Sequence, residues 1–524
     1  MRGVLFASCL GVLLTSWSLP IPEDATRLSA TPSPRMQSAL DETQKLIASD
    51  AARTDNFGFS VALQGDRALI GTPLVATSAG SQAGAAYVFE RVDGVWTEQA
   101  KLLASDGDRS DNFGVSVALD GDRALIGAPG HDSGGLGAGA VYVFEGSSGS
   151  WSQSQKLTAA DSEPGDEFGT TVSLDGPRAL IGAHREGTDT SPFEGAAYVF
   201  DLTGGTWMQT QKLKAGDATP GDKFGTSVSL DGDRALIGAP EDDIGAAGDD
   251  GSAYVFDLVA GVWSEAQKLT ASDATTLDYF GESVALDGDR ALIGAYGDDP
   301  GTGGNYGSAY VFDLAGGSWN ETTKLTAGDG TSLDWFGYAV ALEGDRALIG
   351  AWGDNTDRGD RVGSAYVFDL VGGSWSESAK LEASDALQGE QLGTSVSLDG
   401  DHALLGAPAA DINNVEIDAG AAYVYTLPDP VAVDPSVGEE RLWISQTWPN
   451  PASRTATLRL HLQRPEAVQV TVLDTRGRVV WTMWELVPSG ASELEVPVAG
   501  LAPGVYGVRV ETAGQAATRR LIVI

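Results

Sequence analysis

Two carboxylates five residues apart recur seven times in this chain, each time just before a Phe-Gly pair or, in the last case, before Leu-Gly. The pairs are Asp50/Asp55, Asp106/Asp111, Asp161/Asp166, Asp217/Asp222, Asp273/Asp278, Asp329/Asp334 and Asp385/Glu390. Ca²⁺ is a hard cation that takes oxygen ligands in flexible geometry. The paired carboxylates, with nearby loop carbonyls, are therefore candidate calcium ligands.

A structural role explains the same spacing. The first Asp of a pair can form an Asx-turn, and the second can order the bend into Phe-Gly. Because Ca²⁺ usually needs six or more oxygens, more than one pair supplies, we favour the turn interpretation. The sequence requires no cofactor and leaves Ca²⁺ as the one candidate.

Other catalytic patterns are missing from the sequence. The four histidines, His131, His184, His402 and His461, lack metal-ligand spacing, and no nucleophile elbow or phosphate-binding loop occurs. A carboxylate pair could serve a glycosidase, but a pair present in every repeat is better explained by structure. We therefore predict no enzymatic activity. An enzyme would show a unique cluster of His, Arg, Tyr or carboxylates in one repeat, and the sequence displays none.

The repeat itself has a period of 55 or 56 residues, which is typical of propellers and solenoids. Its Phe-Gly pairs begin at Phe57, Phe113, Phe168, Phe224, Phe280 and Phe336, with Leu392 in the seventh place. Each repeat holds four β-like segments: the run after Phe-Gly, RALIGAP, AYVF, and a segment from Trp to Lys-Leu. Asp-Gly between the first two runs predicts a hairpin with a type I′ turn.

The ends of the array predict a closed ring. A Lys-Leu segment precedes the first Phe-Gly, at Lys45, whereas the seventh repeat stops after Tyr423 without one. The strand count balances if QKLIA at 44 to 48 completes the last repeat, as a closed ring requires and an open solenoid does not. We predict an all-β chain with a seven-bladed propeller over residues 40–427, in which Phe packs between blades and Gly lets backbones approach.

These motifs resemble a known family. FGVSVALDGDRALIGAP and its copies are similar to the FG-GAP repeats of integrin α-subunits, and more so to the bacterial variety with its KLTASD…DxFG…GAP…GSAYVF unit. The resemblance covers about residues 40–427 and implies a seven-bladed propeller without implying an activity. Integrin calcium loops lie between the first two strands of a blade. Here LDGDR at 119–123 replaces such a loop, so those ligands have no counterpart.

The loops after GAP are acidic and differ between repeats, as at 241–252, 296–308 and 352–364. Such variation on a repeated scaffold is where a binding specificity would lie. One loop contains Arg358-Gly359-Asp360, the tripeptide that integrins bind. We favour a charged surface loop over an adhesive motif, because these residues are common in loops.

Charge divides the chain near residue 440. The first 440 residues hold 24 basic and 67 acidic residues, a balance of −43, whereas the remainder has a balance of +3. The acidic part should repel nucleic acid and anionic membranes and favour cations or cationic partners. Solubility in salty surroundings explains the same excess.

The amino terminus matches a secretory signal over residues 1–18, followed by a linker at 19–39. The apolar run from Val4 to Leu14 is too short to span a bilayer, and no other stretch is typical of a transmembrane helix. Cys9, the only cysteine, lies in this signal, so the mature chain should have no disulfide. A lipoprotein signal is the alternative, but Cys9 comes too early for it.

Residues 441–524 predict a small β-sandwich of short alternating strands after a Pro-rich linker at 428–440. The set resembles the type A sorting domain of the bacterial type IX secretion system in Pro449-Asn450-Pro451, the LDTRGR turn at 473–478, LAPGVYGVRV at 501–510 and Arg519-Arg520. The resemblance implies export and recognition by the type IX machinery. An ordinary binding sandwich is the alternative.

Together these features predict a secreted or outer-membrane cell-surface protein of a Gram-negative bacterium. We expect its propeller loops to bind a protein or glycan ligand without catalysis, and to bind no nucleic acid. Two alternatives stay open: a hydrolase or lyase acting on extracellular polysaccharide, and a passive structural protein of the cell surface.

Overall fold

The computed structural model describes residues 40–147, 149–188, 191–244, 248–299, 303–412 and 417–428, and in the carboxy-terminal part 443–448, 455–462, 466–474, 478–487, 490–502, 504–512 and 516–523. The predicted signal at 1–18, the linker at 19–39, residues 429–440 of the second linker and Pro449-Asn450-Pro451 lie outside this description. All the regular secondary structure of the described residues consists of β-strands. No helix in the described residues could cross a membrane.

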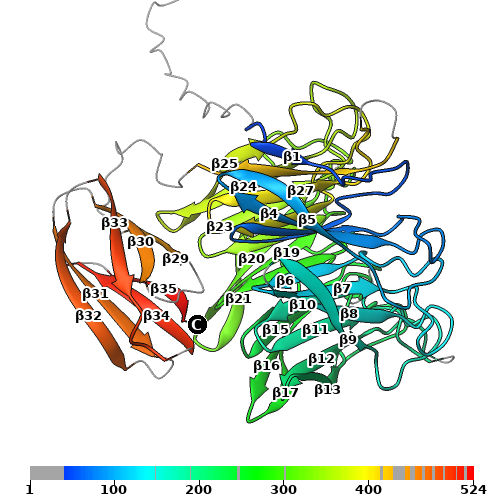
Figure 1. Ribbon diagram of the computed structural model, residues 1–524, viewed down its shortest axis with the longest axis horizontal. Helices are drawn as coiled ribbons and strands as arrows, with labels where there is room; N and C mark the ends of the chain where they lie inside the picture. Colours follow the sequence, from blue (N-terminus) through cyan, green and yellow to red (C-terminus); the bar gives the residue numbers. More distant parts are fainter. Residues whose placement is uncertain are drawn as a thin grey trace, which may run out of the picture. The chain divides into compact units, whose positions relative to one another are not determined.

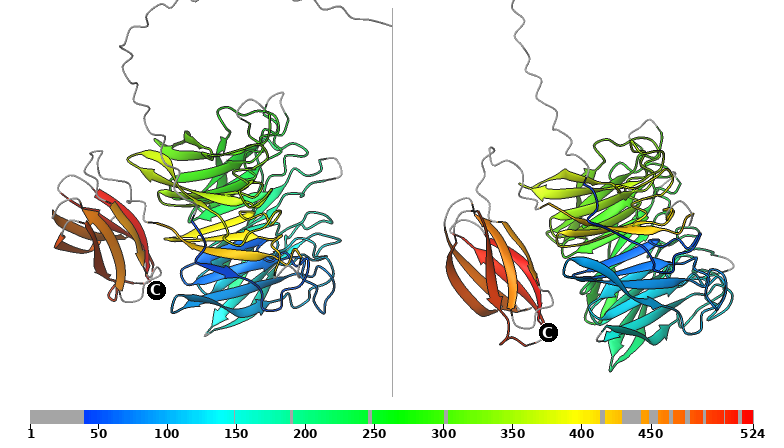
Figure 2. Two further views of the ribbon diagram at one scale, coloured as in Figure 1. Left: turned by 90° about the horizontal axis from the view of Figure 1, so that it is seen from above. Right: turned by 45° about the horizontal axis from the view of Figure 1, so that its top comes forward.

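Seven antiparallel four-stranded sheets follow one another along the chain, and we number them blades 1 to 7 (Figures 1 and 2). The first three are blade 1, with β2 (Ser60–Gln64), β3 (Arg67–Thr72), β4 (Ala85–Val92) and β5 (Val95–Leu102); blade 2, with β6 (Val117–Asp120), β7 (Arg123–Ala128), β8 (Ala140–Ser147) and β9 (Ser150–Leu157); and blade 3, with β10 (Thr171–Asp175), β11 (Arg178–Ala183), β12 (Ala196–Thr203) and β13 (Thr206–Leu213).

The next three blades repeat this arrangement. They are blade 4, with β14 (Ser227–Asp231), β15 (Arg234–Ala239), β16 (Ser252–Val259) and β17 (Val262–Leu269); blade 5, with β18 (Ser283–Asp287), β19 (Arg290–Ala295), β20 (Ser308–Ala315) and β21 (Ser318–Leu325); and blade 6, with β22 (Ala339–Glu343), β23 (Arg346–Ala351), β24 (Ser364–Val371) and β25 (Ser374–Leu381). First strands of successive blades contact one another around the whole ring, so they are the innermost strands.

Blade 7 draws its strands from both ends of the propeller. It contains β26 (Ser395–Asp399), β27 (His402–Ala407), β28 (Ala421–Thr426) and, as its outer strand, β1 (Gln44–Leu46). β1 pairs antiparallel with β28, with Lys45 opposite Tyr423, and Figure 1 shows blue β1 beside the yellow strands of this blade. The predicted closure by the amino-terminal strand is confirmed.

The amino-terminal segment also supplies the side chains that an outer strand needs. Glu42 accepts hydrogen bonds from Ser384, as Glu98 does from Ser49 between blades 7 and 1. The Gln44 amide exchanges two hydrogen bonds with the backbone of Trp96, the outer-strand Trp of the next blade. The closing strand thus reproduces the contacts of an ordinary outer strand.

The two hairpins of a blade use different turns, which corrects the type I′ prediction. In the inner hairpin the loop residues are Gly121 and Asp122, and only Gly121 (φ 59°) has a positive φ. That pattern fits a type II′ turn. In the outer hairpin of blade 1, Asp93 (φ 51°) and Gly94 (φ 81°) both have positive φ, which is the type I′ pattern.

The Phe of each Phe-Gly pair is a core residue between blades. Phe113 is fully buried and meets Tyr142 and Phe144 edge-on, with ring centroids 5.5 and 6.1 Å apart. The same apolar cluster includes Leu69 and Val88 of blade 1. Such edge-to-face pairs stabilise beyond the area that they bury. Leu392 takes this place in blade 7 and is equally buried.

The Gly of each pair allows the blades to touch. Gly114 has a φ of 98°, and a Cβ on it would lie 2.3 Å from the carbonyl oxygen of Ala85 in the preceding blade. A Cβ on Gly71 would lie 2.1 Å from the oxygen of Gly114. Two glycines on adjacent blades therefore let the backbones approach more closely than side chains permit.

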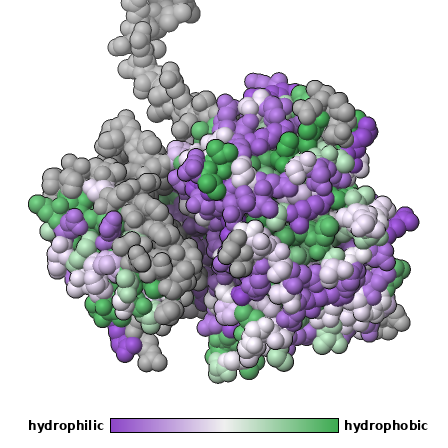
Figure 3. Space-filling view, in the orientation of Figure 1, coloured by the Kyte–Doolittle hydropathy of each residue, from purple (hydrophilic) through white to green (hydrophobic). Residues whose placement is uncertain are grey.

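The inner hairpin turns also bond from blade to blade around a complete ring. The N–H of each turn glycine donates to a side chain of the preceding blade: Gly121 to Gln64, Gly176 to Asp120, Gly232 to Asp175, Gly288 to Asp231, Gly344 to Asp287, Gly400 to Glu343 and Gly65 to Asp399. The first Asp of the LDGDR motif therefore forms a hydrogen bond that links its blade to the next one. On the face shown in Figure 3 the propeller surface is largely hydrophilic, in keeping with its acidic excess.

The carboxy-terminal part forms two further antiparallel sheets. One contains β29 (Trp443–Trp448), β30 (Thr455–Leu462) and β33 (Gly490–Pro497), and the other contains β32 (Val479–Val487), β31 (Glu466–Asp474), β34 (Gly504–Glu511) and β35 (Ala516–Val523) in that order. Both sheets contribute to one apolar core that includes Leu458, Val470, Leu494 and Val508. The predicted β-sandwich is confirmed.

We expect Gly114→Ala to destabilise the propeller much more than Gly121→Ala. Both positions have positive φ, so alanine costs about 1–2 kcal/mol at either one. Only at Gly114 does the added Cβ meet a neighbouring blade, which should cost a further ~1–3 kcal/mol or more, whereas nothing lies within 4 Å at Gly121. Urea unfolding of both variants measures the difference; equal losses would contradict the close-approach argument.

Candidate functional site

The first carboxylate of each pair holds a lysine of the same blade. In blade 4, Asp217 accepts from Lys268 Nζ at 2.7 Å and from the hydroxyl of Tyr254 at 2.9 Å. The lysine partners in blades 1 to 7 are Lys101, Lys156, Lys212, Lys268, Lys324, Lys380 and Lys45, at 2.6 to 2.8 Å from Asp50, Asp106, Asp161, Asp217, Asp273, Asp329 and Asp385. This carboxylate therefore ties the loop entering a blade to its outer strand.

Electrostatics keeps this first carboxylate ionised. Partial burial alone would raise the pKa of Asp217, but hydrogen bonds from Lys268 and Tyr254 outweigh it and lower the pKa. The pKa of Lys268 is raised in return, although its own partial burial opposes the change, because Asp217 and Asp242 both accept from it.

The second carboxylate of each pair orders the turn. In blades 1 to 6 it accepts the backbone N–H of the residue three positions earlier: Ala52 to Asp55, Asp108 to Asp111, Glu163 to Asp166, Thr219 to Asp222, Thr275 to Asp278 and Thr331 to Asp334. These six side chains are between 1% and 7% exposed. Their hydrogen bonds are those that the turn interpretation expects.

Burial acts on this second carboxylate in the opposite direction to the lysine bond. It raises the pKa of Asp278 to about 6, against hydrogen bonds from Thr275, and it raises the pKa of Glu390 to about 7. Oε2 of Glu390 is buried without a hydrogen-bond partner among the described residues. In blades 3 to 7 the pKa of the first member of the pair is therefore lowered and that of the second is raised, although the two carboxylates look equivalent in the sequence.

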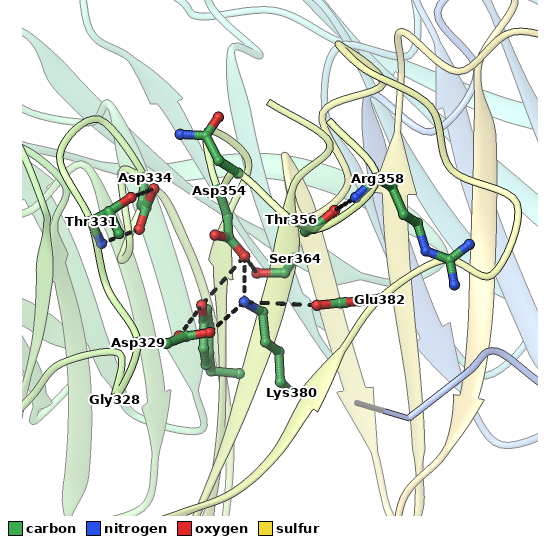
Figure 4. A network of polar contacts seen from close by, with 12 residues as sticks. Gly328, Asp329, Thr331, Asp334, Asp354, Thr356, Arg358, Ser364, Lys380 and Glu382 are labelled. Carbon is green, nitrogen blue, oxygen red and sulfur yellow. Dashed lines mark hydrogen bonds and ion pairs between the residues drawn. The ribbon is translucent and has the colours of Figure 1, made fainter. Parts of the chain in front are cut away.

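A third side chain joins the network from the loop after GAP, and sequence reasoning missed it. At the third position after the alanine of that motif, which is Thr72 in blade 1, stand Val75, His131, Glu186, Asp242, Asp298, Asp354 and Ala410, all buried. In blade 6, Lys380 lies between Asp329 (2.7 Å) and Asp354 (2.8 Å), as Figure 4 shows. Aligning the seven repeats would have revealed this position as acidic in four of them.

The donor sets of these clusters do not fit a calcium site. In each blade the lysine ammonium bonds the first carboxylate, and in blades 3 to 6 it also bonds the third side chain. No group of three or more His, Cys, Asp or Glu side chains in the described part of the chain is arranged to hold a metal ion. We therefore expect the pairs to bind no calcium, and this stays a prediction for experiment.

Asp50 and Asp55 also line a pocket of ≈ 490 Å³ between the loops of blades 1 and 2. Arg53, Lys101 and Arg109 lie on its wall beside them. Because both signs of charge are present, the pocket favours no ligand class.

The Arg358-Gly359-Asp360 loop is a tight turn held from within. Thr356 and Gly359 exchange two backbone hydrogen bonds, and the guanidinium of Arg358 donates to the carbonyl of Ser384. Asp360 accepts the N–H of Gly389 through its backbone oxygen. The arginine is thus engaged with the protein itself.

A second set of variable positions lies beside each Phe-Gly. The residue before the Phe is left-handed in every blade, with φ between 54° and 62°: Asn56, Asn112, Glu167, Lys223, Tyr279, Trp335 and Gln391. In blades 3 to 6 its side chain contacts one of the first two residues after the GA of its own blade. In blade 3, Glu167 lies 2.5 Å from Arg185, and in blade 4, Lys223 lies 2.5 Å from Glu241.

In blades 5 and 6 these positions hold aromatic residues that form one continuous cluster. Tyr279 stacks on Tyr296 with ring centroids 5.1 Å apart, and Trp335 stacks on Trp352 at 4.2 Å. Tyr338, two residues after the Phe of blade 6, meets Tyr296 at 5.6 Å and Trp352 at 5.8 Å and so joins the two stacks. We call these five side chains the aromatic platform; all are half-buried.

Glu282 lies beside this platform, at the position in blade 5 that Tyr338 occupies in blade 6. Burial raises the pKa of Glu282 to about 7, and its charge in turn helps to raise the pKa of Tyr296 and Tyr338. Sequence reasoning saw no unique cluster of Tyr and carboxylates in one repeat. The platform lies outside that expectation, because it joins side chains of two blades that are 17 and 42 residues apart along the chain.

Comparison with known families now identifies the class. The FG-GAP repeat family matches residues 40–89, 96–144, 151–200, 207–256, 263–312, 319–368 and 375–425, and the secretion system C-terminal sorting domain matches 446–524. Since the repeat matches cover more than half of the chain, it belongs to the FG-GAP repeat family. Its sorting domain assigns it to type IX secretion, to a secreted or outer-membrane-surface location, and to contact with the secretion machinery.

Solved structures of similar shape are distant. A fungal alcohol oxidase of the AA5 family, in complex with copper, is 14% identical over 92% of this chain and 99% of its own (TM-score 0.47). PorZ, a surface component of the type IX secretion system of Porphyromonas gingivalis, is 14% identical over 91% and 61% (TM-score 0.41), and a Xanthomonas campestris xyloglucanase 15% over 80% and 60% (TM-score 0.39). These similarities carry no argument about activity. Comparison with curated proteins gives no match.

We expect the same melting temperature in CaCl₂ and in EGTA, because a lysine ammonium already neutralises the first carboxylate of each pair. Differential scanning calorimetry of the secreted protein checks this, with MgCl₂ at equal ionic strength as the control. A rise in melting temperature with CaCl₂ that MgCl₂ does not reproduce would support the calcium interpretation.

We expect Glu390→Gln to stabilise the protein relative to wild type more at pH 8 than at pH 5. The folded-state pKa near 7 exceeds the ordinary value, so the folded protein keeps a proton that the unfolded chain releases, and wild-type stability falls as pH rises through this window. The relative gain should reach up to about 3 kcal/mol, at 1.36 kcal/mol per pKa unit.

Urea unfolding at both pH values measures this difference. Asp93→Asn, in an exposed turn, is the control and should give the same difference from wild type at both pH values. A pH-independent effect of Glu390→Gln would refute the buried-proton assignment.

Proposed function

We propose that the propeller is a non-catalytic binding module, exported through the type IX pathway by its carboxy-terminal domain, whose loops bind a protein or glycan outside the cell. The observation that carries this proposal is where the repeats differ. Strands such as RALIGA recur almost unchanged, whereas the residues beside Phe-Gly and after GA change from Asn and Pro to ion pairs and stacked rings.

This variation supports binding because the changing residues meet one another at one end of the inner hairpins. Core positions such as Phe113 and Ile126 cannot vary without disturbing the contact between blades. Positions beside them that are half-buried carry no such restriction, and so a rigid ring presents them as a variable surface.

One observation favours the enzymatic alternative, a polysaccharide hydrolase or lyase. Glu282 combines partial exposure, a pKa near 7 and three neighbouring tyrosines, which are properties of a general acid or base. A glycosidase needs a second carboxylate across the scissile bond. Glu241 of blade 4, which is paired with Lys223 and whose charge contributes to the raised pKa of Glu282, is a candidate from another blade.

The secreted protein, purified from culture medium, can test these functions together. We expect it to bind at least one member of a panel of immobilised extracellular glycans and matrix proteins, and to leave that ligand chemically unchanged. New reducing ends or unsaturated sugar products would establish the enzymatic alternative. Binding to no member of the panel would favour the passive structural role. The isolated medium fraction from a strain without this protein is the control.

A further inference from the structure

We propose that the aromatic platform of blades 5 and 6, with Glu282, is a binding site for a neutral polysaccharide, and that pyranose rings stack on it. This inference rests on the proposed function and narrows its ligand class. The platform consists of Tyr279, Tyr296, Trp335, Tyr338 and Trp352.

The ring geometry favours a flat ligand over a cation. The interplanar angle is 5° for Tyr279 and Tyr296 and 30° for Trp335 and Trp352. In each pair, therefore, each ring covers one face of its partner. A cage for an ammonium group instead needs several rings with their faces turned to one empty centre. Arg361 already lies over the ring of Trp335. The faces of the Tyr279–Tyr296 pair that the stack does not cover, and the ring edges around Tyr338, are therefore the surfaces onto which the apolar C–H face of a sugar ring can pack.

The backbone indicates that these aromatic residues are not placed for local stability. Tyr279 (φ 56°) and Trp335 (φ 54°) occupy a left-handed position at which blades 1 and 2 have Asn56 and Asn112. Asn tolerates this conformation better than bulky residues do. Bulky residues held in such a conformation cluster at functional sites, and here the same two blades also place an aromatic residue opposite.

Polar groups complete the site. The Glu282 carboxylate is half-buried beside the platform and has no hydrogen bond or ion pair within the described structure, so it can accept hydrogen bonds from sugar hydroxyls. Arg361, whose guanidinium lies 5.5 Å from the centroid of Trp335, is exposed at the other end of the platform and can donate. Donor and acceptor at the two ends suit a ligand rich in hydroxyl groups.

Charge excludes the acidic polymers. The first 440 residues carry a balance of −43, and Glu241 and Asp249 lie near Tyr279, whose pKa their charges help to raise after burial. A polyanion such as alginate or nucleic acid would be repelled at this surface. A neutral polysaccharide meets the rings without that penalty.

Affinity electrophoresis of the secreted protein tests the proposal with four neutral probes: hydroxyethylcellulose, laminarin, arabinoxylan and galactomannan. We expect at least one to retard wild type, and the double variant Tyr279→Asn/Trp335→Asn to lose about tenfold or more in affinity, because the variant removes one ring from each stacked pair. Both variant positions take the residue that blades 1 and 2 have naturally, so the variant should keep its melting temperature.

The control is Glu167→Asn/Gln391→Asn, which changes the same left-handed position in blades 3 and 7 and leaves the platform intact. It should be retarded like wild type. Retardation by none of the four probes overturns the proposal, as does equal weakening in both double variants. Wild-type binding that the platform variant retains overturns the site but leaves the proposed binding function standing.

Discussion

The propeller depends on the contact between glycines of adjacent blades. Where Gly114 meets the strands of blade 1, no Cβ fits on either side, because one would lie 2.1 to 2.3 Å from a backbone oxygen. This close approach brings Phe113 under the neighbouring sheet and lets the turn glycines bond to the side chains of the preceding blade. Repeated around the ring, it requires the last blade to meet the first, and β1 supplies the strand that makes this meeting regular.

Acidic residues stabilise the propeller at two places, the inner hairpin turns and the loops that enter each blade. At the inner turns, carboxylates such as Asp231 fasten one blade to the next through a backbone N–H. At the loops, Asp217 and its counterparts bind a lysine of the outer strand, while Asp222 and its counterparts hold the bend. A repeated pair of carboxylates thus resembles a metal site in sequence, although one member is satisfied by an ammonium group and the other by the backbone.

Rigid repetition also explains how function can be placed on such a scaffold. All seven blades have the same strands, and in each the residue before the Phe, or before Leu392 in blade 7, has a left-handed conformation. Residues of different types at that position therefore occupy equivalent places. Substitution there changes the surface without changing the ring, as the step from Asn112 to the Glu167–Arg185 ion pair and to the Trp335–Trp352 stack shows. Export by the sorting domain brings this surface outside the cell, where glycans and proteins are the available ligands.

The sequence by itself determined the propeller, its seven blades, its closure by Lys45 and its neighbours, and the sandwich at the carboxy terminus, because these follow from periodicity and local strand patterns. It did not determine the turn type of the inner hairpin, because Asp-Gly can be the two loop residues or, as here, Asp can end the strand and Gly can be the first loop residue. Nor could it place Asp354 beside Lys380, or join Tyr296 to Tyr338 across two blades. Such contacts depend on the lateral packing of blades, and only the tertiary structure decides which residues, distant along the chain, that packing brings together.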